Sequence, residues 1–163
     1  MINKINFLFV TVFGIGKIKK IPGSIASLFT VLLLFFLFHI LTFSPKIFLS
    51  LLFIVFFISL YAVKIFIKDL TNKDPKEVVI DEFIGQSIPI CLYEIFHTIQ
   101  KDITQILKFY FIIFVLFRIF DIVKPFPVSY YDKNFKNSFG VVMDDVCAGL
   151  YVVAILVSFM ALT

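Results

Sequence analysis

The chain has 163 residues, of which 61% are hydrophobic, and its formal net charge is +4. Soluble domains are about 45–50% apolar, so this composition excludes an ordinary soluble domain and indicates an integral membrane protein. Its lysines flank apolar runs, which fits anionic lipid headgroups better than nucleic acid. We therefore expect one membrane-embedded domain, residues 1–163, with the membrane and no nucleic acid as its partner.

Two apolar runs of membrane-spanning length, residues 25–43 and 47–67, come first in the chain. A transmembrane helix needs about 20 residues, so each run is long enough to cross a bilayer. The residues Ser44-Pro45-Lys46 separate them and predict a tight turn. The segment before residue 25 contains a short apolar stretch without a small-residue cleavage site, so we do not expect a signal peptide.

Three more helical segments are predicted after a polar loop, residues 68–77. Asp74 can cap a helix that begins at Pro75, with Glu77 three residues after the cap, and Pro89 should kink that helix. The last two segments are residues 106–123 and 141–162, joined by the loop 124–140. The predicted fold is thus an all-α polytopic bundle with about four to five transmembrane helices, and whether 83–97 crosses is left open.

The lysines indicate how such a bundle is oriented. They cluster before the first span and after the second, whereas only Lys46 lies between the two. The positive-inside rule then places the N-terminus and the loop 68–82 in the cytoplasm. Five crossings would bring every polar cluster of the chain to the cytoplasmic face, where we expect the functional site.

Five carboxylates interrupt the apolar pattern near the predicted helix ends. An ionised carboxylate near hydrocarbon is costly unless it is paired or bound to a metal, and Mg²⁺ takes oxygen ligands of this kind. Adjacent helical side chains diverge by about 100°, so we expect one acid of each adjacent pair to bind the metal and the other to orient water. The alternative is that these acids pair with interfacial lysines. The five are Asp81, Glu82, Asp121, Asp144 and Asp145, the last two in the first turn of the last span.

Basic side chains and a helix start supply the matching anion site. Arg118 lies three residues before Asp121, so it either pairs with that acid or grips a phosphate with its planar fork. Ser24 is predicted to cap the first span, and a helix N-terminus beside Lys20 can bind an anion. Lys124 adds a third positive charge, before the prolines that end the preceding helix.

Other phosphatase chemistries lack their motifs here. Neither Cys91 nor Cys147 belongs to a C-x-x-x-x-x-R run, and the chain has no D-x-D-x-[TV] sequence. We interpret both cysteines as packing residues and both histidines, His39 and His97, as structural residues.

Four motifs contain most of the charged residues named above and span residues 20–149. They are Lys20-Ile21-Pro22-Gly23-Ser24, Val78-Val79-Ile80-Asp81-Glu82-Phe83-Ile84-Gly85, Phe117-Arg118-Ile119-Phe120-Asp121-Ile122-Val123-Lys124-Pro125-Phe126-Pro127 and Gly140-Val141-Val142-Met143-Asp144-Asp145-Val146-Cys147-Ala148-Gly149. In this order they resemble the phosphatidylglycerophosphatase A family. The resemblance implies an all-helical enzyme of the bacterial inner membrane that hydrolyses phosphatidylglycerophosphate with Mg²⁺. Two departures are Ser24, where threonine is expected, and Ile80, where tryptophan is common.

The resulting hypothesis assigns a role to each polar residue. Mg²⁺ is bound by Glu82, Asp121 and one of Asp144 or Asp145, and Asp81 or the remaining aspartate orients the attacking water. The substrate phosphate is bound by Lys20, Ser24, Arg118 and Lys124. A phosphatidyltransferase is the main alternative, but its D-G-x-x-A-R type run is missing. A non-enzymatic small membrane subunit is a further alternative, and the oligomeric state is left open.

Overall fold

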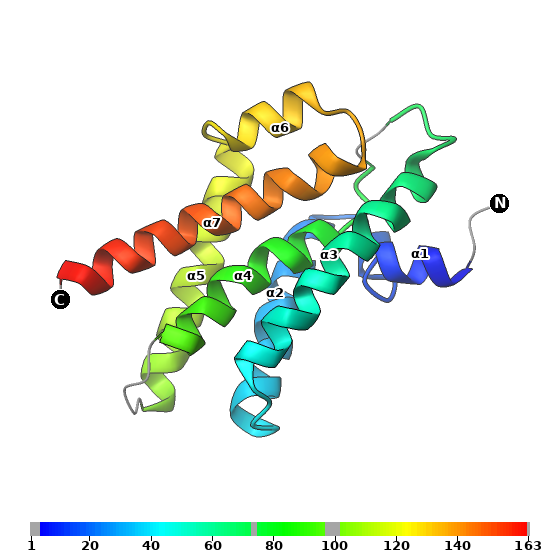
Figure 1. The fold of residues 1–163 in the computed structure, drawn as a ribbon. Coiled ribbons are helices and arrows are strands. Elements are labelled where there is room, and N and C mark those ends of the chain that lie inside the picture. Colours follow the sequence, from blue (N-terminus) through cyan, green and yellow to red (C-terminus); the bar gives the residue numbers. More distant parts are fainter. Residues whose placement is uncertain (1–3, 73–74, 97–101, 163) are drawn as a thin grey trace.

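The computed structural model describes residues 4–72, 75–96 and 102–162, and within these ranges the chain is helical and has no β-strand. The all-α prediction is confirmed. The elements in chain order are α1 (Lys4–Val10), η1 (Ile15–Lys17), α2 (Pro22–Phe35), η2 (Phe36–Ile40), α3 (Pro45–Ile67), α4 (Ile80–Phe96), α5 (Ile103–Val123), α6 (Val128–Asn134) and α7 (Ser138–Leu162) (Figure 1).

Among the described residues, three helices are long and apolar enough to cross a membrane: Pro22–Ile40, Pro45–Ile67 and Ser138–Ala161. The first joins α2 to the π-helical turn η2. Helix α4 has 17 residues, and α5 has 21. These five helices are compatible with the predicted four to five spans, and crossing by α4 and α5 remains a prediction.

Helix α4 is the central element of the bundle, because it contacts α2, α3, α5 and α7 (Figure 1). Its contact with α7 is close at two glycines. A Cβ added at Gly149 would collide with the carbonyl oxygen of Gly85. Small residues let helix backbones approach in this way in membrane proteins, and the contact fixes α4 and α7 relative to each other.

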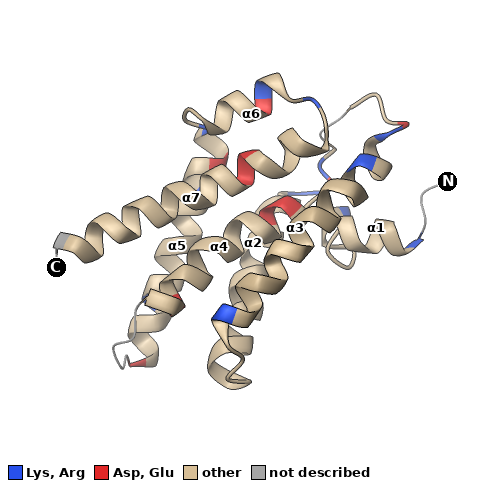
Figure 2. Cartoon of the chain, in the orientation of Figure 1, with Lys and Arg blue, Asp and Glu red and all other residues tan. Residues whose placement is uncertain are grey.

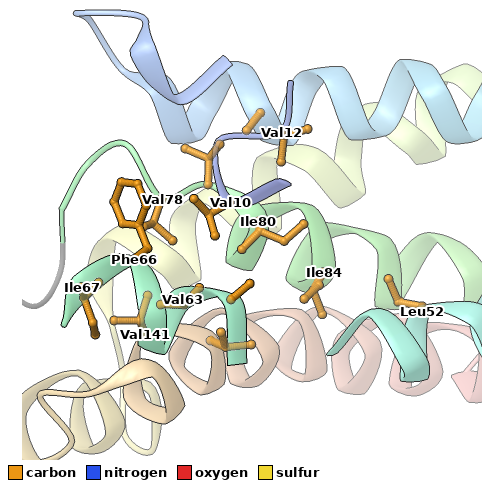
Figure 3. Packing of buried hydrophobic residues seen from close by; sticks show 14 residues of the cluster. Val10, Val12, Leu52, Val63, Phe66, Ile67, Val78, Ile80, Ile84 and Val141 are labelled. Carbon is orange, nitrogen blue, oxygen red and sulfur yellow. The ribbon is translucent and has the colours of Figure 1, made fainter. Parts of the chain in front are cut away.

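Two apolar clusters hold these helices in place. The first contains Val10, Val63, Val79 and Ile84, and it packs α1 and α3 against the start of α4 and α7 (Figure 3). The second is built around the fully buried Tyr110, Phe117 and Ile90, and it packs α5 against α4 and α7. The N-terminal end of α4 is therefore positioned from several sides.

The start of α4 differs from the prediction. The helix begins at Ile80, not at Pro75, and Asp74 lies outside the described residues. The reason is tertiary: Val78 and Val79 are buried, and the Val79 N–H donates to the carbonyl of Val10 at 3.0 Å. This contact holds the segment in a non-helical conformation against the end of α1. From Ile80 the helix continues past Pro89 to Phe96.

Two other helix starts also correct the predictions. Helix α2 begins at Pro22, so Ser24 lies inside its first turn and does not cap it. Helix α7 begins at Ser138, where the Asn137 side chain accepts hydrogen bonds from the N–H groups of Phe139 and Gly140. Asp144 and Asp145 therefore lie in its second turn rather than its first. Within the predicted loop 124–140, the short helix α6 was not expected.

Candidate active site

Three carboxylates from two helices converge at the start of α4. Each of Asp81, Glu82 and Asp145 offers an oxygen, and these three oxygens all lie within 4.8 Å of one another. Asp81 and Asp145 are buried, with 7% and 3% of their surface exposed. Figure 2 shows acidic positions of α4 and α7 at this level of the bundle. Such an arrangement of buried acids is unfavourable unless a cation or a proton neutralises it.

The side chains of the adjacent acids Asp81 and Glu82 were expected to diverge, but each brings an oxygen to the same place. The Glu82 N–H donates to Oδ1 of Asp81 at 3.1 Å, so the aspartate folds back over the start of the helix. The longer glutamate then reaches the same point from the next position. Both can therefore contribute to one site, because they lie in the first turn, where backbone N–H groups are free to bind a side chain.

Arg118 and Asp121 form an ion pair on α5, which is one of the two arrangements that the sequence left open for this arginine. The guanidinium Nη1 lies 2.7 Å from Oδ2 of Asp121 and donates to the Ser27 hydroxyl at 3.4 Å. The charged neighbours of Asp121 include Glu82 and Asp145. The arginine is thus held, facing α2, at the edge of the acidic group that Asp81, Glu82 and Asp145 form.

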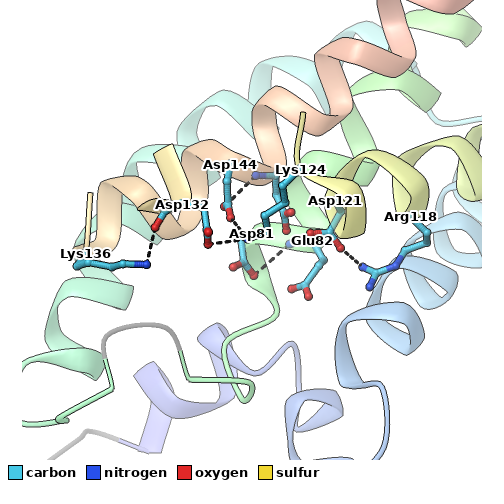
Figure 4. A network of polar contacts seen from close by, with 9 residues as sticks. Asp81, Glu82, Arg118, Asp121, Lys124, Asp132, Lys136 and Asp144 are labelled. Atoms are coloured by element: carbon cyan, nitrogen blue, oxygen red, sulfur yellow. Dashed lines mark hydrogen bonds and ion pairs between the residues drawn. The ribbon is translucent and has the colours of Figure 1, made fainter. Parts of the chain in front are cut away.

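Lys124 joins the end of α5 to two other helices (Figure 4). Its Nζ lies 2.7 Å from Asp132 of α6 and 2.8 Å from Asp144 of α7. Partial burial alone would lower the pKa of Lys124, but these two hydrogen bonds raise it, so the ammonium stays charged. The same contact outweighs burial at Asp132 and lowers the pKa of that carboxyl. Asp132 was not predicted as a site residue, because nothing in the loop 124–140 indicated that it turns back onto Lys124.

The start of α2 closes the site from the opposite side. A Cβ added at Gly23 would collide with Oε1 of Glu82 and would lie 3.4 Å from Nη1 of Arg118. Only glycine leaves room for the Glu82 carboxylate at this point. The approach of the α2 backbone to the acidic group therefore explains why glycine precedes Ser24.

Most of these residues line one cavity of about 500 Å³, and Asp132 and Ser27 contact its lining residues Lys124 and Arg118 without being part of the lining. Its wall contains the five predicted carboxylates together with Ser24, Arg118 and Lys124. It also contains Lys19 and Lys76, which were not predicted as site residues. Among the described residues that line it, Lys19 rather than the predicted Lys20 is present. Acids that can hold a cation and bases that can hold an anion thus share one space.

Two buried polar atoms of described residues that line this cavity have no hydrogen-bond partner, namely Oε2 of Glu82 and Nε of Arg118. Buried polar groups are normally satisfied, so these atoms indicate water or a ligand that completes the site.

The remaining candidates lie elsewhere or act in packing. His39 lies 3.3 Å from Glu94 and 3.4 Å from the Tyr110 hydroxyl, in the later parts of α2–η2 and α4. Cys91 and Cys147 are free and buried, as expected of packing residues. His97 lies outside the described residues.

The bundle and its site define a class of protein. Apolar helices of membrane-spanning length carry a cavity in which carboxylates, an arginine and lysines meet. This combination is suited to a membrane enzyme that acts on a phosphorylated lipid, since phosphoryl transfer depends on positioned charges of both signs.

The particular family follows from comparison with known proteins. The family model described as phosphatidylglycerophosphatase A matches residues 8–160, and the chain belongs to that family of phosphatases, which act on a phosphate monoester. The chain is 33% identical over 155 residues to the phosphatidylglycerophosphatase A of Haemophilus influenzae, covering 95% of this chain and 88% of the relative. It is 30% identical over 145 residues to that of Escherichia coli, covering 88% and 77%.

A third relative has a different name. A Bacteroides thetaiotaomicron protein with the provisional name phosphatidylinositol-3-phosphatase is 33% identical over 142 residues, covering 86% of this chain and 84% of the relative. No solved structure matches the chain.

Proposed function

We propose that this protein is a Mg²⁺-dependent phosphatase that hydrolyses phosphatidylglycerophosphate to phosphatidylglycerol and phosphate in phospholipid biosynthesis. The single observation that carries the proposal is the cavity in which Asp81, Glu82 and Asp145 converge beside Arg118 and Lys124. The names of two relatives support the substrate.

The acidic group fits a hard divalent cation. Its donors are carboxylate oxygens, which Mg²⁺ prefers, and Oε2 of Glu82 is buried without a hydrogen-bond partner in the part of the chain that the structure describes. Asp81, Glu82 and Asp145 would hold the ion, and Asp121 and Asp144 would lie beside it as further ligands or as partners of the bases. When bound, Mg²⁺ would polarise the phosphate and lower the pKa of a coordinated water.

The chain's own residues would bind and orient the phosphate. The planar guanidinium of Arg118, held by Asp121 at 2.7 Å, would contact two phosphoryl oxygens. Lys124 and Lys19 would add charge from either side, and Ser24 a hydroxyl hydrogen bond, since all line the cavity. Lys20 would act through its charge alone. An acid not occupied by the cation would accept the proton of the attacking water.

The proposed location is the bacterial inner membrane, with the cavity facing the cytoplasm. Lysines Lys19, Lys76 and Lys124 line the cavity, and lysine-rich ends of membrane helices favour the cytoplasmic side. Phosphatidylglycerophosphate would reach the site from the inner leaflet.

A phosphate-release assay in detergent tests the proposal. Purified wild type should release phosphate from phosphatidylglycerophosphate with Mg²⁺, EDTA should abolish the release, and Glu82→Gln should lower it by a factor on the order of 10² or more. Phosphatidylinositol 3-phosphate is the comparison substrate because of the third relative's name. A preference for that lipid would overturn the proposed substrate, and a requirement for a second substrate would indicate a phosphatidyltransferase.

A further inference from the structure

Two exposed isoleucines stand out at the rim of the otherwise charged cavity. Ile21 is 68% exposed and Ile122 is 71% exposed, and both line the cavity. The other apolar lining residues behave differently: Val78 and Pro75 are buried, and Pro22 is half-buried. Part of the rim therefore presents large apolar side chains outward beside a site built for a phosphate.

The backbone of Ile21 indicates that its position is imposed by the fold. Its φ of 48° and ψ of 49° are left-handed, a conformation that is an outlier for a β-branched residue. Ile21 is the N-cap residue of α2, which begins at Pro22. Its carbonyl accepts a hydrogen bond from the Ile25 N–H at 3.2 Å. Backbone strain of this kind concentrates at functional sites, and here it directs an isoleucine to the cavity rim.

Ile122 is connected to the phosphate-binding part of the site through α5. It lies four residues after Arg118 and therefore on the same side of the helix, next to Asp121. Val123 is almost equally exposed, at 69%, but it does not line the cavity. The helix thus carries a charged residue and, one turn later, an apolar residue that face the same space.

We infer that Ile21 and Ile122 form the portal through which the acyl-bearing part of the substrate leaves the cavity. The inference rests on the proposed function. A phosphomonoester held by Arg118 and the acidic group remains attached to glycerol and hydrocarbon, which must pass over some part of the rim. Apolar side chains stabilise that passage in proportion to the area removed from water. The portal selects lipid phosphates over water-soluble phosphomonoesters with the same headgroup.

The test compares two substrates of the full-length protein in mixed micelles. One is long-chain phosphatidylglycerophosphate, and the other is its deacylated, water-soluble headgroup. Ile122→Ser and Ile21→Asn remove the apolar side chains, and asparagine tolerates the left-handed backbone. We expect kcat/KM for the lipid to fall about tenfold, through KM. One methylene in a hydrophobic pocket is worth about 10–200-fold, and contacts at an exposed rim belong at the low end of that range. The deacylated headgroup should be hydrolysed at the wild-type rate.

The matched controls are Val123→Ser and Ile18→Asn, which change exposed apolar residues that do not line the cavity. Both should leave the two rates unchanged. An equal loss on both substrates, or the same lipid-specific loss in Val123→Ser, overturns the portal. So does wild-type behaviour of Ile122→Ser, which carries the test if Ile21→Asn folds poorly. A wild type that releases no phosphate from the lipid rejects the proposed function itself.

Discussion

Replacing Gly23 by alanine should separate catalysis from stability. The added Cβ would collide with Oε1 of Glu82 and would lie 3.0 Å from its Cδ and 3.4 Å from Nη1 of Arg118. The backbone of Gly23 is helical, within α2, so alanine is allowed there. The obstacle is the end of a flexible side chain, which can move away, rather than a fixed backbone.

The magnitude follows from the displacement. Carbon atoms in contact normally lie about 3.5–4.0 Å apart, so relief requires Glu82 to shift by on the order of 1 Å. A misplacement of about 1 Å in a catalytic site costs about 10²-fold in rate. Alanine is also favoured over glycine in a helix by about 0.5–1 kcal/mol. Activity should therefore fall by roughly 10- to 100-fold while the unfolding temperature stays level or rises.

The assay measures phosphate release from phosphatidylglycerophosphate and thermal unfolding on the same preparation. Leu28→Ala, an exposed position on α2, is the control and should leave catalysis unchanged. Wild-type turnover in Gly23→Ala would show that the position of Glu82 against α2 does not matter. A lowered unfolding temperature would contradict the prediction that the side chain can yield.

Three further predictions concern packing and charge. Gly149→Ala should lower stability by about 2 kcal/mol, or about 4–8 °C in unfolding temperature, because its Cβ would meet the backbone of Gly85 rather than a flexible side chain; an unchanged temperature would contradict the close helix contact. Arg118→Lys should lower kcat/KM about 10- to 100-fold with little change in unfolding temperature. A large fall in unfolding temperature that accompanies the loss of activity would show that the arginine has a structural role. Asp132→Asn should unfold at a lower temperature than wild type at pH 7. The lowered pKa of Asp132 means that this difference is present above the ordinary aspartate pKa of about 4 and disappears as the pH falls through the folded value; a difference that persists at low pH would refute the ion-pair explanation.

Local sequence patterns were sufficient to predict where the long helices lie, but not to predict the residues at which several of them begin. The apolar runs predicted the long helices, because membrane spans are set by length and hydrophobicity. The predicted start of α4 was wrong. The burial of Val78 and Val79 and the hydrogen bond from Val79 to Val10 outweigh the local preference of the preceding residues for a helix cap. A cap can be recognised from its neighbours in sequence, whereas a contact with α1 cannot.

Composition and motifs were enough to predict a helical membrane protein, its family and which acids and bases carry charge into the bundle. The pairs that these groups form are seen in the packed helices alone: Asp81 with Glu82 and Asp145, Arg118 with Asp121, and Lys124 with Asp132 and Asp144. The hydrophobicity of a segment is the sum over its own residues, so it can be read from the sequence of that segment. The partners of a charge depend instead on the relative rotation and approach of separate helices, which close glycine contacts such as that between Gly85 and Gly149 set here.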